Sequence, residues 1–599
     1  MTQVIDAIDV LVWGGGSGGV AAALQAARSG ADTLLLTPGS WLGGMVSAAG
    51  VCCPDGNELS PWQTGIWGAF LRALEQAEPA GLDHNWVSCF GYRPASAEAI
   101  LQGWVGAEPR LQWWSDCRLL EVERQGARIT AVQIERQGRG QRLGCKVVID
   151  GSDRGDLLPL AAAPFRFGWE AQECWSEPSA PAQQRLDSDP FFQDQPVQSP
   201  TWVVIGQLTS DTLAVDPAAT KALPAPFTQA CEAFGLERTI SYGRLPGGLV
   251  MLNWPLHGND WHGQLERAFS GDDAAEAALN REMQAHSLSF ASVLKEASDG
   301  WIKLGAAFPQ QAGSPAPWLA AMPYWREGRR LVGLHTVIEQ ELLPQSIGAT
   351  IAPLPFDAAG VLQSIAVGNY ANDHHYPGPD WPLAPKSCRW GGRWSGTPFC
   401  VPYGALVSAE VENLLAADKA FSTSHMANGA TRLQPLILNI GQAAGAAAAL
   451  SLRQSCPPAA LPVRLLQEAL ISDPQAPAGP LPLWDTPWHH PAWAERQRAA
   501  LNDPGLLAPD GSLAGTAAGL QVHQAPPATG ERLWQGELRP DGEGAYHLEL
   551  ADRGGSWPLI TLEPALHQWL ANQERGRPVA LIGCANPWGP WLRVSRLAR

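Results

Sequence analysis

The hydrophobic pattern of the first 37 residues predicts a strand, a helix and a second strand. Residues 8–13 are a short apolar run with β-branched members, which is typical of a buried strand. Residues 17–29 carry small apolar side chains at helical spacing, and Gly30 stands where a left-handed helix terminator belongs. Residues 32–37 repeat the strand pattern. This order indicates an α/β fold.

Three glycines between the first strand and the helix follow the spacing G-x-G-x-x-G. Gly14 permits the tight turn, Gly16 lets a pyrophosphate approach the backbone, and Gly19 lets the helix lie close to the strand. The helix start offers unpaired N–H groups and a positive dipole end. The pattern predicts a dinucleotide site; the alternative is a glycine-rich turn in an α/β unit that binds nothing.

The second strand ends in Thr37, where this motif usually has an acidic residue about 20 residues after the glycines. A threonine hydroxyl binds a ribose diol less strongly than a carboxylate does, by roughly 1–2 kcal/mol. We therefore expect a weaker ribose contact at Thr37 rather than the loss of the site.

Later segments predict one long helix and a separate tail. Residues 434–452 are rich in alanine with helical apolar spacing, and Asn439 and Gln442 within them favour a buried helix over a membrane span. After a Pro- and Trp-rich stretch at 474–491, the tail predicts a helix at 491–501 and strands within 533–550 and 556–562.

Composition narrows the functional classes. The net charge of −17 argues against nucleic acid or an anionic membrane surface as the main partner. The eleven cysteines are odd in number and form no C-x-x-C, so we expect no metal site and reduced thiols in a cytoplasmic protein. The first residues lack the pattern of a signal peptide, and we expect no membrane insertion.

Several segments resemble flavoprotein motifs. The stretch W-L-G-G-M-V-S-A-A-G at 41–50 is similar to a loop that runs past the FAD ribityl chain and the flavin ring. The stretch K-V-V-I-D-G-S-D-R-G-D-L-L at 146–158 resembles the D-A-T-G-D-G-D-L segment of FAD-dependent oxidoreductases, with departures at 151–154. Residues 413–450 resemble the closing segment N-L-L-V-A-G-R…T-H…G-S-T-R…P…G-Q-A-A-G, with Asp418 and Lys419 in place of Gly-Arg.

Two middle segments agree with the same group: R-E-G-R-R-L-V-G at 326–333, and Y-A-N-D-H-H at 370–375 followed by V-P-Y at 401–403. The matches run in order from about residue 8 to residue 452. The chain thus resembles an FAD-dependent oxidoreductase of the glutathione-reductase-like flavoprotein superfamily, in the branch that carries the name xanthan lyase-like.

The resemblance implies an α/β fold: a Rossmann-like, three-layer FAD-binding domain with an inserted α+β substrate domain and a small C-terminal module. We expect the FAD-binding domain at 1–165 and 401–456, the substrate domain at 166–400, and the appended module at 485–599. The residues expected to contact the cofactor are Gly14, Gly16, Ser17, Gly19, Thr37, Gly43, Gly44, Met45, Gly151, Asp156, Arg432, Gly441 and Gln442.

The implied reaction passes a hydride from a small organic substrate to flavin N5, with an unknown electron acceptor. His375 and His425 match histidines of the family pattern and are candidates to take the substrate proton. Arg329 and Arg330 are candidates to bind the substrate, and Arg432 to stabilise the reduced flavin. The alternatives are a non-catalytic flavin-fold scaffold and an NAD-dependent dehydrogenase.

Overall fold

The computed structural model describes residues 3–214, 223–309, 316–346, 349–378, 381–514, 530–550 and 555–598. In chain order its helices begin and end as follows: α1 Ser17–Arg28, α2 Gly65–Ala77, α3 Pro94–Ala107, α4 Leu157–Leu160, α5 Gln172–Trp175, α6 Gln183–Ser188, α7 Phe191–Asp194, α8 Gly235–Ser241, α9 Asp273–Ala297, α10 His425–Thr431, α11 Gln434–Gln454, α12 Val463–Ile471, α13 Trp493–Asn502 and α14 Pro564–Ala571.

The central sheet has the strand order β3-β2-β1-β6-β5-β4, and β17 pairs with β6. Strands β3, β2, β1, β6 and β17 run parallel, while β4 and β5 are antiparallel. Its strands are β1 Gln3–Trp13, β2 Thr33–Leu36, β3 Leu111–Trp114, β4 Cys117–Gln125, β5 Arg128–Arg136, β6 Arg139–Asp150 and β17 Leu414–Ala416. The strand–helix–strand unit predicted at 8–37 is confirmed as β1, α1 and β2.

Helix α11 lies directly against α1, and two glycines permit the contact. A Cβ atom at Gly441 would lie 2.2 Å from the carbonyl oxygen of Gly18, and one at Gly445 would lie 2.1 Å from that of Ala22. Among the described residues, α11 is the one helix with the length and hydropathy to cross a membrane, yet 94% of that apolar window is buried inside the protein. The predicted buried helix at 434–452 is confirmed.

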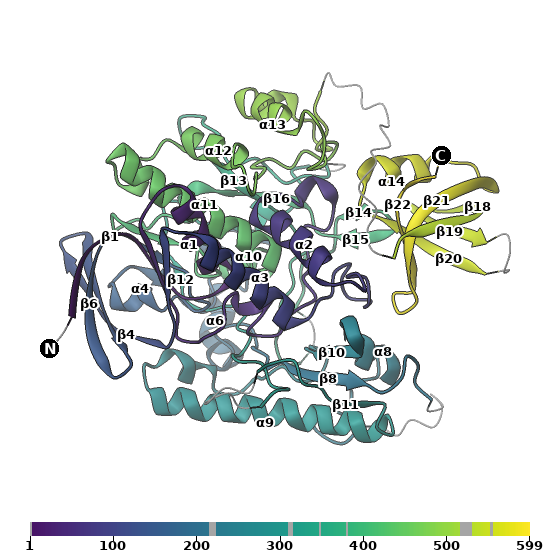
Figure 1. The fold of residues 1–599 in the computed structure, drawn as a ribbon, viewed down its shortest axis with the longest axis horizontal. Coiled ribbons are helices and arrows are strands. Elements are labelled where there is room, and N and C mark those ends of the chain that lie inside the picture. Colours follow the sequence, from purple (N-terminus) through teal and green to yellow (C-terminus); the bar gives the residue numbers. More distant parts are fainter. Residues whose placement is uncertain are drawn as a thin grey trace.

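A smaller sheet of order β11-β8-β10-β9 lies beside the central one, with the long helix α9 along it (Figure 1). Three two-stranded ribbons, β7 with β12, β13 with β16 and β14 with β15, connect these parts. The bounds are β7 Phe165–Arg166, β8 Val204–Leu208, β9 Gly243–Arg244, β10 Leu249–Leu252, β11 Ile302–Leu304, β12 Arg330–Leu331, β13 Ser364–Asn369, β14 Cys388–Trp390, β15 Arg393–Ser395 and β16 Pro398–Pro402.

The C-terminal segment closes a separate barrel of order β18-β19-β20-β22-β21, drawn in yellow at the right of Figure 1. Its strands are β18 Arg532–Gly542, β19 Ala545–Leu550, β20 Ser556–Thr561, β21 Arg577–Asn586 and β22 Trp591–Leu597. The barrel has its own apolar core, which includes Leu538, Leu548 and Leu592. The strands predicted within 533–550 and 556–562 and the helix predicted at 491–501 are confirmed.

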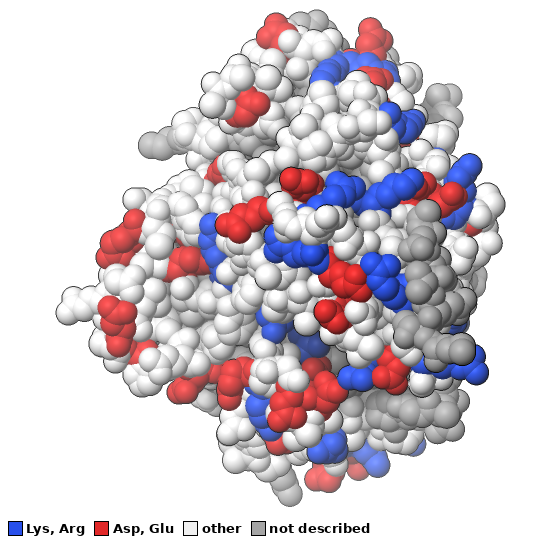
Figure 2. All heavy atoms as spheres, turned by 90° about the vertical axis from the view of Figure 1, so that its left-hand side faces the viewer, with Lys and Arg blue, Asp and Glu red and all other residues white. Residues whose placement is uncertain are grey.

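Charged side chains of both signs are interleaved over the face that lies at the left of Figure 1 (Figure 2). On this face the acidic side chains are scattered among basic ones rather than gathered into one acidic patch.

Candidate functional site

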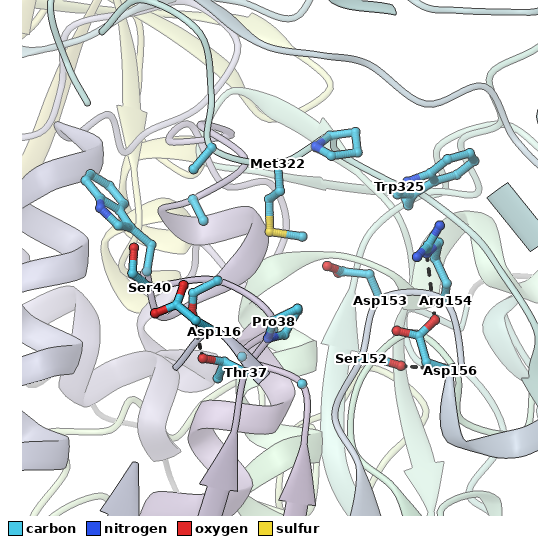
Figure 3. A pocket seen from close by; sticks show the side chains of 18 of the residues that line it. Thr37, Pro38, Ser40, Asp116, Ser152, Asp153, Arg154, Asp156, Met322 and Trp325 are labelled. Carbon is cyan, nitrogen blue, oxygen red and sulfur yellow. Dashed lines mark hydrogen bonds and ion pairs between the residues drawn. The ribbon is translucent and has the colours of Figure 1, made fainter. Parts of the chain in front are cut away.

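A cavity of about 760 Å³ opens at the carboxyl ends of β1, β2 and β6, beside the glycine turn (Figure 3). In parallel α/β sheets this edge is where ligands bind. The residues that line it are Trp13, Gly14, Gly15, Gly16, Thr37, Pro38, Gly39, Ser40, Trp41, Ala48, Asp116, Ser152, Asp153, Arg154, Asp156, Glu276, Phe308, Pro309, Ala321, Met322, Pro323 and Trp325. We call this cavity the first pocket. Four of the predicted cofactor contacts line it: Gly14, Gly16, Thr37 and Asp156.

The start of α1 already receives one carboxylate from the protein itself. The amide of Gly18 donates to Oδ2 of Asp418 at 2.8 Å. A Cβ atom at Gly16 would lie 2.5 Å from that same oxygen. The glycine at this position is thus required by the fold as well as by any phosphate that approaches the turn.

The unusual residues Asp153, Asp418 and Lys419 form one buried cluster. Nζ of Lys419 pairs with Asp153 and lies 3.1 Å from Oδ1 of Asp418. Burial raises the pKa of Asp418 to about 6 against the opposing effect of Lys419. The departures at 151–154 and at 418–419 therefore compensate each other. Asp153 and Asp418 add negative charge where the family pattern has uncharged residues, and the ammonium group of Lys419 neutralises it.

Thr37 faces the first pocket with its hydroxyl already in use. Its Oγ1 donates to the carbonyl of Gly39 at 2.6 Å and accepts from Nε1 of Trp113 at 3.0 Å. Asp116, at the end of β3, lines the same wall, and Figure 3 shows it next to Thr37. Asp116 supplies a carboxylate close to the position where the motif lacks one. No sequence motif marks Asp116, since it lies 79 residues after Thr37 along the chain.

Apart from Arg432, which lines a second cavity described below, the remaining predicted cofactor contacts lie behind the first pocket. The hydroxyl of Ser17 donates to the carbonyl of Gly43 at 2.7 Å, so the Gly-Gly-Met loop packs on the glycine turn. Gln442 is fully buried, and its side chain accepts from the amide of Ile66 at 2.9 Å and donates to the carbonyl of Ala476 at 2.7 Å. The others in this group are buried at the turn, in the loop or in the α1–α11 contact: Gly19, Gly44, Met45, Gly151 and Gly441.

A second cavity of about 310 Å³ lies at the N-terminus of α11. Its lining combines carboxylates, cations and aromatic rings: Val51, Cys53, Asp55, Glu58, Trp86, Val87, Tyr242, Met251, Asn253, Pro255, Tyr324, Arg326, Tyr370, Ala371, Asp373, His375, Lys386, Arg393, Trp394, Ser395, Arg432, Leu433 and Gln434. We call it the second pocket. Neighbouring residues of one segment, Trp325 and Arg326, line the first and the second pocket respectively, so the two cavities lie on either side of it.

Four buried polar atoms of the second pocket have no hydrogen-bond partner among the described residues. They are Oε2 of Glu58, Nε of Arg326, Nε of Arg432 and Oε1 of Gln434. A buried polar atom left unpaired costs about 1–3 kcal/mol, so a cluster of them points to a ligand that pairs with them. Both donors and acceptors are present, which indicates a ligand that carries both.

His375 is held between two aspartates in the second pocket. Its Nδ1 lies 2.9 Å from Oδ2 of Asp260, and its Nε2 lies 3.0 Å from Oδ2 of Asp373. Burial raises the pKa of both aspartates, but Arg326, Arg432 and His375 outweigh it and hold the pKa of each well below its ordinary value. An ionised carboxylate only accepts hydrogen bonds, so each aspartate accepts from the ring nitrogen that faces it.

The other three candidate catalytic residues lie outside both pockets. His425 is buried, with Nδ1 at 2.8 Å from Glu327 and Nε2 at 2.5 Å from the Tyr376 hydroxyl, and burial and Arg330 hold its pKa well below the ordinary value. Arg330 is buried in ion pairs of 2.8 Å with Glu327 and with Glu170. Arg329 donates to a backbone carbonyl at 2.9 Å and lines neither cavity.

Two acids of the second pocket have raised pKa values. Burial and the neighbouring Glu58 raise the pKa of Asp55 to about 7, and burial also raises the pKa of Glu58. Both follow the Gly-Gly-Met loop within 14 residues, at a spacing of three. This closely spaced acidic pair is visible in the sequence, but it belongs to none of the family motifs.

A family model described as FAD dependent oxidoreductase matches residues 9–470 of the chain. The chain belongs to this family. Its cofactor is accordingly FAD. No curated protein matches the chain.

Several solved structures are similar to parts of this chain. A triple mutant of the flavin-dependent brominase Bmp2 matches at 9% identity over 77% of this chain and 83% of its own, with a TM-score of 0.32. The L-proline dehydrogenase from P. horikoshii matches at 17% identity over 26% of this chain and 24% of its own, with a TM-score of 0.16. GidA from Aquifex aeolicus matches at 18% identity over 25% of this chain and 26% of its own, with a TM-score of 0.20. The chain thus spans about a quarter of the length of both of these proteins.

The residues present fit FAD. The first pocket has the glycine turn and the helix start that suit a pyrophosphate. Three of its four acids are already paired with cations of the protein: Asp153 with Lys419, and both Asp156 and Glu276 with Arg154. At the other end, Nε of Arg432 and Oε1 of Gln434 offer an unpaired donor and acceptor at the start of α11. A flavin pyrimidine edge carries the complementary acceptors and donor.

Proposed function

We propose that this FAD-dependent oxidoreductase oxidises a small polar substrate in the second pocket, with the cofactor reaching from the glycine turn to the N-terminus of α11. The observation that carries the proposal is the set of unpaired buried polar atoms in a charged cavity at that helix start. Bound FAD supplies the two-electron acceptor, its N5 taking a hydride from a substrate carbon.

Arg432 and the start of α11 stabilise negative charge at the flavin end of the site. The guanidinium is held by the Tyr324 hydroxyl at 2.7 Å and by Asp373 at 3.0 Å, with Nε unpaired among the described atoms. A fixed cation and a helix dipole favour the anionic reduced state of a nearby ring.

Asp55, rather than a histidine, takes the substrate proton in this proposal. Both nitrogens of His375 donate to aspartates, and His425 is buried away from the pocket, so neither is placed to accept a proton. Asp55 lines the pocket with a pKa near 7, which suits a general base at neutral pH. Asp260 and Asp373 instead hold His375 in the pocket wall, with both ring nitrogens in use.

The finer classification is part of the same proposal. The matched segments at 41–50, 146–158 and 413–450 support the glutathione-reductase-like superfamily and the xanthan lyase-like branch. We retain the division into an FAD-binding domain at 1–165 and 401–456, a substrate domain at 166–400 and a module at 485–599. A cytoplasmic location is proposed from the cysteine pattern.

The test is anaerobic photometry of the bound flavin against a panel of alcohols, amines, hydroxy acids and sugars. We expect one compound class to bleach the flavin, and Asp373→Asn to slow that bleaching without loss of flavin. If no class reduces a fully loaded protein that dithionite does reduce, the non-catalytic scaffold is the better description. If reduction occurs and Asp373→Asn leaves its rate unchanged, the second pocket is not the substrate site.

A further inference from the structure

The C-terminal barrel lies outside the family match at 9–470, yet it contacts the wall of the second pocket. We propose that the barrel is part of the substrate site: it holds the β14–β15 hairpin so that Arg393 faces the second pocket and anchors an anionic, oxygen-rich group of the substrate, such as a carboxylate. This inference rests on the proposed function of that pocket.

The tip of the hairpin is fixed by barrel residues. The amide of Gly391 donates to Nδ1 of His567 at 3.0 Å. A Cβ atom at Gly391 would lie 2.2 Å from the carbonyl oxygen of Thr561, and one at Gly392 would lie 2.6 Å from that of Leu559. Hairpin and barrel backbones therefore touch without intervening side chains, and a shift of the barrel moves the hairpin.

Arg393 itself lies between the barrel and the pocket. Its guanidinium carbon is 5.0 Å from the ring centre of Trp591 in the barrel. One terminal nitrogen donates to the carbonyl of Val87 at 3.1 Å and the other to Sγ of Cys89 at 3.2 Å. A stacked guanidinium that keeps free N–H groups is held in orientation for a planar anion.

A second contact joins the barrel to the segment around Asp83, which also contributes to the lining of the second pocket. Asp83 is buried and accepts from Nδ2 of Asn586 at 2.7 Å, from Nε1 of Trp591 at 3.2 Å and from Nε of Arg593 at 3.2 Å. Three residues after Asp83, Trp86 lines the second pocket. Trp591 thus both stacks on Arg393 and bonds to the segment that carries another part of the wall.

Arg393 acts on the pocket acids Asp55 and Glu58, whose pKa values its charge lowers against the effect of burial, but it is not paired with either of them. Arg326 pairs with Asp260 at 3.1 Å, and Arg432 pairs with Asp373 at 3.0 Å. Among the described residues, no ion pair joins Arg393 to a carboxylate. Of the three pocket arginines it is therefore the one left to bind an anionic group, and an Arg–carboxylate contact is charge-assisted and often bidentate.

The experiment uses the FAD-loaded full chain and two small probes, malonate and malonamide, with binding read from the flavin absorption spectrum. We expect malonate to bind wild-type protein more tightly than malonamide, and Arg393→Met to weaken malonate about tenfold while leaving malonamide within about twofold. Arg393→Lys keeps the charge and restores part of the preference.

Trp591 is tested as a positioning residue. We expect Trp591→Leu to weaken malonate about threefold and to speed hydrogen exchange in 388–395, whereas Trp591→Phe, which keeps a ring face, restores both. The matched control is Trp534→Leu, since Trp534 lies in the barrel core away from the hairpin and bonds to the carbonyl of Gly583. Flavin content is expected to stay at the wild-type level in all variants.

Malonate that does not bind, or that binds Arg393→Met as tightly as wild type, overturns the proposal even if some substrate reduces the flavin. Malonate binding that depends on Arg393 and Trp591 supports it even if no compound of the photometric panel is oxidised. An equal effect of Trp591→Leu and Trp534→Leu on malonate binding would mean that the barrel acts only through general stability, and would remove it from the site.

Discussion

The base of the first pocket is the backbone of one turn, residues 13–16, whereas the second pocket is lined by side chains from segments as far apart as Val51 and Gln434. The turn of the first pocket offers backbone amide groups in a close-packed loop, an arrangement that recurs where a dinucleotide binds at the N-terminus of a helix. The second is a set of charged groups balanced against each other. The difference separates pyrophosphate binding at the turn, which is set locally, from the flavin end and the substrate site, which are set by tertiary packing.

The largest expected effect concerns the buried cluster behind the first pocket. Lys419→Met leaves Asp153 and Asp418 without their cation, and breaking such a buried pair costs about 3–5 kcal/mol of the free energy of unfolding. Denaturant unfolding of the FAD-loaded protein measures it. The double variant with Asp153→Asn should recover part of the loss.

The exposed pair of Arg118 and Glu135, 2.9 Å apart, provides the control. Arg118→Met should change the free energy of unfolding far less than Lys419→Met does, because an exposed ion pair is screened by solvent. If Lys419→Met lowers the free energy of unfolding as little as Arg118→Met does, the ion pairs of Lys419 with Asp153 and Asp418 do not stabilise the fold.

The second prediction concerns the proton acceptor of the second pocket. Asp55 must be ionised to accept a proton, and its pKa is raised to about 7, so the rate of flavin reduction should rise with pH through about 7 and level off above it. Asp55→Asn should lower the rate about 100-fold and abolish that rise. Stopped-flow reduction at a series of pH values measures both.

Glu58→Gln provides the matched control, because Glu58 is one cause of the raised pKa of Asp55. Its removal should shift the midpoint of the pH profile to lower pH. An Asp55→Asn variant that keeps the wild-type pH profile would assign the proton to another group.

The sequence predicts the residues of the first pocket better than those of the second. Gly14, Gly16 and Thr37 line the first pocket, and a contiguous motif predicts their positions along one strand–helix–strand unit. His375 and Arg432 were found in the second pocket only through quoted family segments.

Arg393 and the barrel contact of Trp591 have no local signal in the sequence, and Asp55 is marked only by its spacing of three from Glu58. Arg330 and His425 match family segments, yet both lie in ion pairs or hydrogen bonds around Glu327 outside either cavity. Spacing along the chain shows which residues share a motif; it does not show which side of a packed segment faces a cavity.

The smallest expected effect is on the flavin potential. Arg432→Met removes a cation from the flavin end of the site and should lower the reduction potential by about 30 mV, which is about 1.4 kcal/mol for a two-electron couple. Potentiometric titration of the bound flavin measures it. Arg329→Met, which alters an arginine outside both pockets, should leave the potential unchanged, and an equal shift in the two variants would remove Arg432 from the cofactor.

The placement of the flavin is tested most directly by a crystal structure of the FAD-loaded protein. We expect the pyrophosphate at the turn of Gly14 and Gly16, and the flavin ring bonded to Nε of Arg432 and Oε1 of Gln434, with Asp55 and His375 facing the substrate side. A ring bound elsewhere, with those two atoms still unpaired, would contradict the assignment of the second pocket.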